Sequence, residues 1–313
     1  MVALGPRVRV DERNKDGHPK TYCPYRTQGT VMVERRPGLT VLTHLTLVLG
    51  AGFVALPVWI AFVASTHAAH DFLSGMMPMW PGDQFIENYW KVLSQGESTA
   101  GAPPIGLMLI NSTVMALGIA VGKIAISLLS AFAIVYFRFP LRMVAFWIIF
   151  LTLMLPVEVR ILPTYEVAAG LGLLNTYSGL ILPLVASATA TFLFRQVFLT
   201  IPDELAEAAR IDGAGPMKFF RDILIPLSRT NIAALFVILF IYGWNQYLWP
   251  LLVTTDASHY TAVMGIQRMV AVPDSEPLWH LIMATAILAM LPPVIVILLM
   301  QRLFVQGLIE QEK

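Results

Sequence analysis

The sequence predicts an all-α, polytopic membrane protein with six transmembrane helices, and three observations support this prediction. Apolar residues make up 57% of the 313 residues, whereas Asp, Glu, Lys and Arg together make up only 13%. A soluble domain carries about 25% charged residues, so the bilayer is the expected solvent. Several apolar runs reach the roughly 20 residues that a helix needs to cross the hydrocarbon core. The Lys and Arg residues also follow the asymmetry that orients spans in a membrane.

Six apolar runs are candidates for the spans. We expect them at residues 40–65, 107–136, 143–157 (extending toward 163), 176–198, 231–253 and 280–304. The first run is too long for the apolar region of a cleavable signal peptide. Residues 66–106 are long for a loop between two spans, so we expect short interfacial helices there.

The positions of the basic residues predict the orientation of the spans. Most of the 21 Lys and Arg residues lie before the first span, in the second-to-third loop, in the fourth-to-fifth segment and in the C-terminal tail. The opposite loops hold only Lys91, Arg160 and Arg268. We therefore expect a multi-pass protein of the plasma membrane, which is the inner membrane if the cell is Gram-negative, with both termini cytoplasmic.

The chain divides by composition into a polar tail and a long apolar region. Residues 1–36 are expected to form a cytoplasmic, disordered N-terminal tail, because they are largely polar and lack helical periodicity. Residues 37–313 are expected to form one transmembrane domain. The single cysteine, Cys23, excludes an internal disulfide framework and a Cys-rich metal site. The basic residues cluster near membrane borders rather than on one face, so no nucleic-acid partner is expected.

A polar, charged segment at about residues 200–228 separates the fourth and fifth expected spans. Its residues predict a compact pair of short helices at the membrane surface. Asp203 can cap the first helix, and Gly213 can end it in the left-handed conformation. Pro216 can start the second helix, and Pro226 can end it.

Helical spacing predicts an apolar face on each of these two helices. Leu205, Ala208 and Ala209 are expected to share one face of the first helix, while Glu207 stays polar and available to a basic residue of a partner. The apolar residues of the second helix are Phe219, Phe220, Ile223 and Leu224. Composition alone leaves open an ordinary amphipathic loop at the membrane interface.

An ordered set of residues in this segment carries more information than its composition. The set reads EAA-x-x-DGA followed by Phe and Ile-Pro, and its members are Glu207, Ala208, Ala209, Asp212, Gly213, Ala214, Phe220, Ile225 and Pro226. In this order and position, the set resembles the coupling loop through which ABC-importer permeases contact a separate ATPase. Longer runs are similar to sugar-type (MalG-type) ABC-importer permeases, and within that family most similar to permeases of sn-glycerol-3-phosphate importers. These runs are Ser130–Arg142, Thr152–Thr164, Ala186–Gln196, Phe240–Leu252 and Met300–Lys313.

The resemblance covers residues 35–313 and implies a fold, a function and partners. The implied fold is that of a type I ABC-importer permease, and the implied function is transport of sn-glycerol-3-phosphate or glycerophosphodiesters. The implied partners are a second, different permease, a homodimer of an ATP-binding subunit, an external solute-binding protein and the lipid bilayer. This chain would form half of the pore and bind no cofactor, since ATP and Mg²⁺ would be held by the ATPase.

Polar residues in the expected spans are candidates for a substrate pathway. The candidates are Glu158, Arg160, Trp244, Asn245 and Gln246. The guanidinium of Arg160 suits a phosphate monoester, although Glu158 is close enough in sequence to neutralise it. Asn245 could instead form a hydrogen bond to a neighbouring helix. For the mid-span Lys123 we favour pairing with a carboxylate or helix carbonyls at the seam with the second permease over contact with substrate.

The sequence gives no support for an enzyme. Gly118-x-x-x-Gly122-Lys123 is one residue too short for a P-loop, and the two glycines favour close helix packing instead. No catalytic set and no metal-ligand spacing are recognisable. Two other functions stay open: a maltose- or oligosaccharide-type importer permease, and an ion-coupled secondary transporter. The second would need several carboxylates within the membrane, and only Glu158 comes near it.

Overall fold

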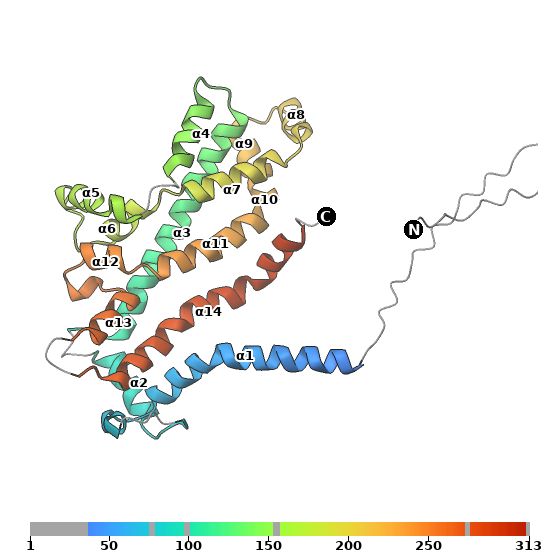
Figure 1. The fold of residues 1–313 in the computed structure, drawn as a ribbon. Coiled ribbons are helices and arrows are strands. Elements are labelled where there is room, and N and C mark those ends of the chain that lie inside the picture. The colour runs from blue at the N-terminus through green and yellow to red at the C-terminus, as the bar shows by residue number, and fades with distance from the viewer. Residues whose placement is uncertain (1–36, 75–78, 97–100, 153–156, 273–275, 311–313) are drawn as a thin grey trace, which may run out of the picture. The chain divides into compact units, whose positions relative to one another are not determined.

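A computed structural model describes residues 37–74, 79–96, 101–152, 157–272 and 276–310 (Figure 1). These residues form helices and loops, with no strand among them. The chain divides into two units, residues 1–54 and 55–313. Helix α1 (Pro37–Ser65) begins in the first unit and ends in the second, and its residues Gly38–Ser65 are long and apolar enough to span a membrane.

The second unit continues with helices of very different lengths. In chain order they are η1 (Ala69–Ser74), α2 (Phe85–Ser94), α3 (Ile105–Tyr136), α4 (Arg142–Leu151), α5 (Val157–Gly170), α6 (Tyr177–Ile181), η3 (Leu182–Leu184), α7 (Ala188–Leu199), α8 (Asp203–Ile211), α9 (Pro216–Phe219), η4 (Phe220–Leu224), α10 (Ile225–Leu227), α11 (Arg229–Trp244), α12 (Leu248–Val253), η5 (Ala257–His259), α13 (Ala262–Val270) and α14 (Trp279–Glu310). The short helices expected within residues 66–106 are confirmed by η1 and α2.

The candidate spans agree with the sequence in part. Among the described residues, α1, α3 and α14 contain candidate spans on their own, and two bent pairs raise the number to five by length and composition. One pair joins Tyr177–Leu184 to Ala188–Leu199 at 51°, and the other joins Pro216–Leu227 to Arg229–Trp244 at 74°. The six continuous spans that the sequence predicts are therefore not all present as unbroken helices.

Two predicted spans are divided for local reasons. In the run 143–157, helix α4 ends at Leu151 after 10 residues, and the next described helix is α5. In the run 231–253, α11 ends at Trp244 and α12 starts at Leu248. Pro250 offers no N–H to the carbonyl of Gln246, so one α-helical hydrogen bond is missing close to this break.

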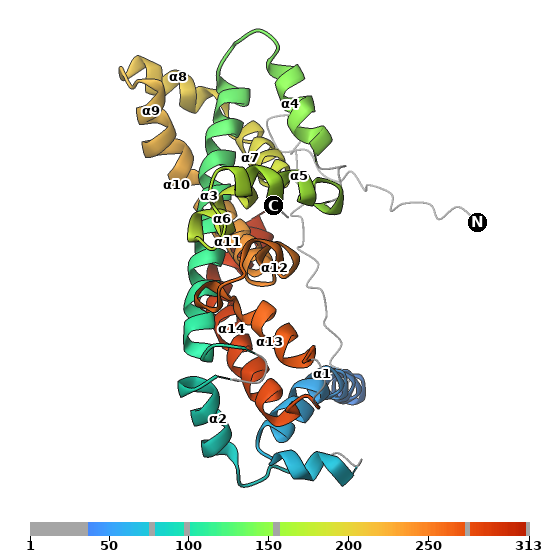
Figure 2. The same cartoon turned by 90° about the vertical axis from the view of Figure 1, so that its left-hand side faces the viewer.

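Helix α3 is the central element of the second unit. Figures 1 and 2 show α7 and α11 beside it, and the three helices share the core cluster that contains Ala120, Phe194 and Phe240. Gly118 and Gly122 allow close contact on another side of α3. A Cβ atom at either position would lie 2.6 Å from a side-chain atom of Ile181 or Val185. The prediction that these glycines serve helix packing is confirmed.

A buried amide fixes α3 to loops far away in the sequence. Asn111, which is fully buried, donates from Nδ2 to the carbonyl oxygens of Ser258 (2.8 Å) and Tyr260 (3.0 Å). The hydroxyl of Tyr177 donates to the Oδ1 atom of Asn111 at 2.7 Å. Because both donors and the acceptor are paired, the amide carries no unpaired polar atom into the core.

Candidate functional site

The EAA segment, defined as residues 200–228, folds as the predicted pair of short helices. The first is α8, and the second is built from α9, η4 and α10. Figure 2 shows α8 and α9 beside one end of α3. The Schellman arrangement that closes α8 explains the compact turn. The N–H of Gly213 donates to the carbonyl of Arg210 (3.0 Å), and the N–H of Ala214 donates to that of Ala209 (2.8 Å).

Gly213 has the role predicted for it. Its φ is +72°, in the left-handed region that glycine occupies at little cost. A Cβ atom there would meet no other atom within 4 Å. The position therefore requires glycine because of its backbone conformation and not because of limited space.

The start of α8 differs from the prediction. Pro202, and not Asp203, occupies the N-cap position, and no side chain accepts a capping hydrogen bond there. Asp203 is already the first helical residue, so it does not fill the position from which a cap accepts the free amides. Asp203 and Glu204 instead place negative charge in the first turn, where it complements the helix dipole.

The predicted apolar face of α8 is also divided. Ala209 is 5% exposed and packs in the core with Ala206, whereas Ala208 is exposed and Leu205 is 38% exposed. Glu207 lies on the exposed surface as well. The inward side of α8 thus follows Ala206 and Ala209, which pack in the cluster shared with α3, α7 and α11.

The second helix of the EAA segment is anchored by aromatic side chains. The ring of Phe220 lies 4.8 Å from that of Phe132, and the ring of Phe219 lies 5.2 Å from that of Tyr136, between centroids. Phe219, Phe220 and Leu224 are buried in one cluster with residues of α3, α7 and α11. The apolar face predicted for this helix is therefore confirmed, and it joins the segment to the end of α3.

Pro226 does not end the second helix as predicted. The helix continues through Ile225 and Pro226 to Leu227, and the 74° bend comes at Ser228. Residues Phe220–Leu224 adopt a π-helical turn immediately before. Since Pro226 has no N–H for an α-helical bond, a change in hydrogen-bond register at this point is expected. The N–H of Ser228 donates to the carbonyl of Leu224 at 3.0 Å.

The remaining members of the EAA set lie in different environments. Asp212 is exposed at the C-cap of α8, and Ala214 packs against the core cluster. Ile225 also packs against that cluster, while Pro226 is exposed. The segment therefore has a buried side toward α3 and an exposed side that carries Glu207, Ala208 and Asp212.

The candidate pathway residues do not share one environment. Trp244 is 3% exposed and stacks on Phe240 at 5.8 Å between centroids, so it is a core residue. Asn245 is exposed and caps the end of α11, where its N–H donates to the carbonyl of Ile241 (3.0 Å). Gln246 donates from Nε2 to the carbonyl of Tyr242 at 3.1 Å.

The two charged pathway candidates belong to α5. Arg160 is exposed in this helix. Glu158 lies in the first turn of α5, and its side chain is outside the described part of the structure.

Lys123 is buried within this chain. It is 6% exposed within this chain, and its Nζ atom lies 3.8 Å from the ring centroid of Tyr242. Among the residues whose side chains are described, no carboxylate of this chain pairs with it, and the pairing expected at the seam with a second permease stays a prediction. Tyr242 was not predicted, because a tyrosine in an apolar run gives no sequence signal of such a contact.

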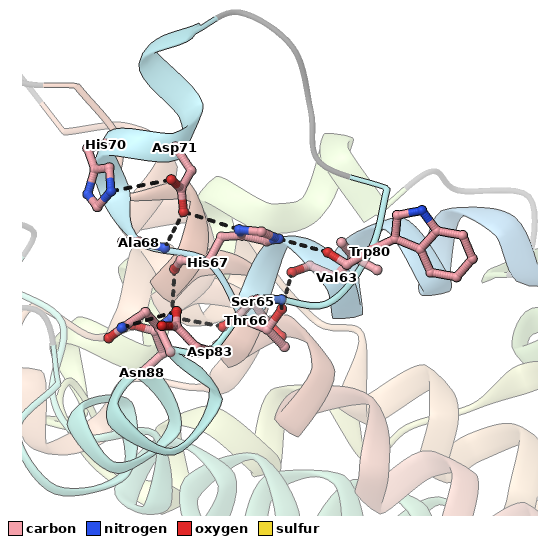
Figure 3. Close-up of polar contacts among 12 residues, drawn as sticks. Val63, Ser65, Thr66, His67, Ala68, His70, Asp71, Trp80, Asp83 and Asn88 are labelled. Atoms are coloured by element: carbon pink, nitrogen blue, oxygen red, sulfur yellow. Dashed lines mark hydrogen bonds and ion pairs between the residues drawn. The ribbon is translucent and has the colours of Figure 1, made fainter.

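Hydrogen bonds order the loop between α1 and α2 (Figure 3). Asp71 accepts bonds from the N–H of Ala68 (3.0 Å) and from the ring of His67 (3.1 Å). These two bonds, the backbone one first, hold the pKa of Asp71 below its usual value. Asn88 donates to the carbonyl oxygens of Ser65 (2.9 Å) and His67 (2.8 Å). His67 therefore links this loop through its ring to Asp71 and through its carbonyl to Asn88.

Several candidate spans and a two-helix EAA segment packed against α3 fit a membrane permease subunit of the ABC-importer class. Residues 123–310 match the family described as "Binding-protein-dependent transport system inner membrane component", and this chain belongs to that family. The ABC-importer permease resemblance inferred from the sequence is confirmed.

Known relatives agree with this assignment. The chain is 60% identical to the "sn-glycerol-3-phosphate transport system permease protein UgpE" of Agrobacterium fabrum over 282 residues, which are 90% of this chain and 100% of the relative. The proteins of that name from Rhizobium meliloti and Salmonella typhi are 59% and 57% identical over the same shares.

A solved structure supports the fold independently. The chain superposes with a TM-score of 0.72 on a chain of a bacterial ABC transporter involved in the import of the acidic polysaccharide alginate. The match covers 85% of this chain and 96% of the other, at 19% identity. This likeness confirms the predicted fold of an ABC-importer permease.

Proposed function

We propose that this chain is the membrane permease subunit of an ATP-driven importer for sn-glycerol-3-phosphate or glycerophosphodiesters. The observation that carries the proposal is the 60% identity that extends over the full length of an sn-glycerol-3-phosphate transport system permease. A relationship of this extent includes the spans as well as the EAA segment.

The proposed complex contains a second, different permease, a homodimer of an ATP-binding subunit and an external solute-binding protein. ATP and Mg²⁺ belong to the ATP-binding subunits, and this chain binds no cofactor. Residues 37–313 form the transmembrane domain, residues 1–36 form a cytoplasmic tail, and both termini face the cytoplasm of the cell. The positive-inside distribution of Lys and Arg supports this orientation.

The EAA segment is the proposed receiver of movement from the ATPase. Its exposed side, with Glu207, Ala208 and Asp212, is available to a partner. Its buried side contacts the end of α3 through Phe219 and Phe220. Helix α11 follows directly after the bend at Ser228. A displacement of the segment would therefore act on two core helices at once.

The substrate pathway is proposed to pass Arg160, whose exposed guanidinium suits a phosphate group. Glu158 and the 245–246 turn belong to the same proposed region, whereas the burial of Trp244 favours a packing role.

The test is uptake in proteoliposomes that contain the complete complex, with the binding protein outside and ATP inside. We expect uptake of labelled sn-glycerol-3-phosphate that requires ATP and is reduced by excess unlabelled ester but not by maltose. Competition by maltose would favour the oligosaccharide-type permease. Uptake driven by an ion gradient without ATP would favour a secondary transporter and contradict the proposal.

A further inference from the structure

Lys123 is a cation deep inside the second unit. It lies near the middle of α3, the candidate span Ile105–Tyr136, and only 6% of its surface is exposed. An ammonium group at this depth is costly, so such residues are rare and usually mark a path for an ion or a substrate.

The local partners of Lys123 stabilise its position without neutralising its charge. The ammonium lies over the face of Tyr242 in α11, at 3.8 Å from the ring centroid. A cation–π contact leaves the ammonium's net charge in place and does not use its N–H groups on an oxygen acceptor. No carboxylate forms an ion pair with Lys123 among the side chains that the structure describes.

A second cation lies close to the first. The charge of Arg160 in α5 is near enough to repel the charge of Lys123. Ile161, next to Arg160, packs in the same apolar cluster as Ile119, which lies one turn before Lys123 on α3. Tyr242 packs against this cluster as well. Two cations are thus held in one region by the packing of three helices, and a shared anion would relieve their repulsion.

We propose that Lys123, held over Tyr242 and facing the same region as Arg160, is a contact for the phosphoryl group of the substrate as it crosses the membrane. The inference rests on the proposed function, because it requires an anionic substrate. It adds a mid-membrane contact on α3 to the outer contact at Arg160. The ammonium donates charge-assisted hydrogen bonds to phosphate oxygens, and Tyr242 keeps the flexible lysine side chain in place.

The experiment measures uptake of sn-glycerol-3-phosphate by the complete complex in proteoliposomes, at saturating substrate and binding protein. We expect Lys123→Gln and Lys123→Met to lower the uptake rate about tenfold or more, and Lys123→Arg to keep most of it, because the charge is retained. ATP hydrolysis in the absence of substrate should stay at the wild-type level. Uptake by Lys123→Met at the wild-type rate would overturn the inference.

A charge-rescue variant covers the case in which these substitutions prevent assembly. Lys123→Cys is made in a Cys23→Ser background and treated with aminoethyl methanethiosulfonate, which attaches an ammonium by a disulfide. We expect uptake to recover with this reagent but not with neutral methyl methanethiosulfonate. Equal results with both reagents would contradict a role for the charge. The Cys23→Ser complex, treated in the same way, controls for partner cysteines.

Arg195→Gln is the matched control. Arg195 lies over the ring of Phe146 at 4.4 Å, so it is also a cation on an aromatic face, but it belongs to α7. We expect near-normal uptake for this variant, and a loss equal to that of Lys123→Gln would indicate a general structural effect and overturn the inference. If the wild-type complex imports only neutral sugar, the proposed function fails. If it imports the ester and Lys123 variants do so equally well, only the present inference fails.

Discussion

Single residues decide where the EAA segment turns and how α3 is fixed. Gly213 was predictable from the sequence because a left-handed helix end has a strong preference for glycine. The capping role predicted for Asp203 was wrong. A cap at Asp203 would require the helix to begin at Glu204, but it begins at Asp203 itself. The two carbonyl groups that accept from Asn111, those of Ser258 and Tyr260, lie more than 140 residues away in the chain, and local sequence carries no signal of such contacts.

Replacing Gly213 should impair coupling through backbone strain. With φ at +72° and no neighbouring atom within 4 Å of an added Cβ, Gly213→Ala costs about 1 kcal/mol in the local fold whatever the side chain's size. We expect an inserted complex with reduced ATP-dependent uptake. Gly213→Asn is the matched variant, since asparagine tolerates this conformation, and its uptake should be closer to wild type. Wild-type uptake by both Gly213→Ala and a bulkier Gly213→Val would contradict the role of this turn.

Asn111→Leu should destabilise the second unit. The change leaves the carbonyls of Ser258 and Tyr260 without their donor, and orphaning the buried carbonyl of Tyr260 costs about 1–3 kcal/mol. We expect the midpoint of thermal unfolding in detergent to fall by several degrees. Ser94→Ala, which removes an exposed hydrogen bond to Trp90, is the control and should change the midpoint little. Equal midpoints for the two variants would show that the buried amide is not important.

At the scale of elements, hydrophobic runs gave the positions of the helices but not their continuity. The expected spans at 107–136 and 280–304 are single helices, whereas 176–198 and 231–253 are broken. Apolar composition is the same on both sides of a break, so it cannot reveal one. The faces of α8 were also predicted only in part, because the tertiary contact of Ala206 and Ala209 decides which side is buried.

The aromatic contact between η4 and α3 should be needed to transmit movement. Phe220→Ala removes the ring that lies 4.8 Å from Phe132, and large-to-small core changes of this kind cost about 3–5 kcal/mol. We expect complexes that retain ATP hydrolysis but lose most uptake. A double-mutant cycle with Phe132→Ala measures the coupling between the two rings. Strictly additive effects of the two substitutions would contradict a direct connection.

The loops between helices should respond to acid. Asp256 accepts bonds from the N–H of Ser258 (3.1 Å) and its hydroxyl (2.8 Å), which lower the pKa of the carboxyl group, and Asp71 is held in a similar way. A carboxyl group whose pKa is lowered in the folded state stabilises the fold at pH values above its ordinary pKa of 3.8. This stabilisation is lost as the pH falls through the pKa of the folded state. We expect loop protection in hydrogen exchange to be constant from about pH 5 to 8 and to fall below about pH 4.

The corresponding amide variants check the cause of that acid response. Asp71→Asn and Asp256→Asn remove the titrating group, so the acid-dependent loss in each loop should disappear. An unchanged pH profile in both variants would place the effect elsewhere.

At the scale of the whole molecule, the class of protein followed from the sequence because two independent signals agree. Composition and charge asymmetry predict a polytopic membrane protein, and the EAA set with its longer matching runs indicates a permease of an ABC importer. The packing of the EAA segment against α3 gives this motif a physical connection to the core. Substrate contacts were the least predictable part, since Lys123 and Tyr242 meet only through the tertiary fold.

The central claim is that solute movement through this chain is driven by a separate ATPase acting on the EAA segment. The most direct measurement compares uptake of sn-glycerol-3-phosphate by proteoliposomes that contain the complete complex with uptake by proteoliposomes that contain this chain alone. We predict ATP-dependent uptake by the complex and none by the isolated chain. Solute accumulation or nucleotide hydrolysis by the isolated chain would contradict the claim.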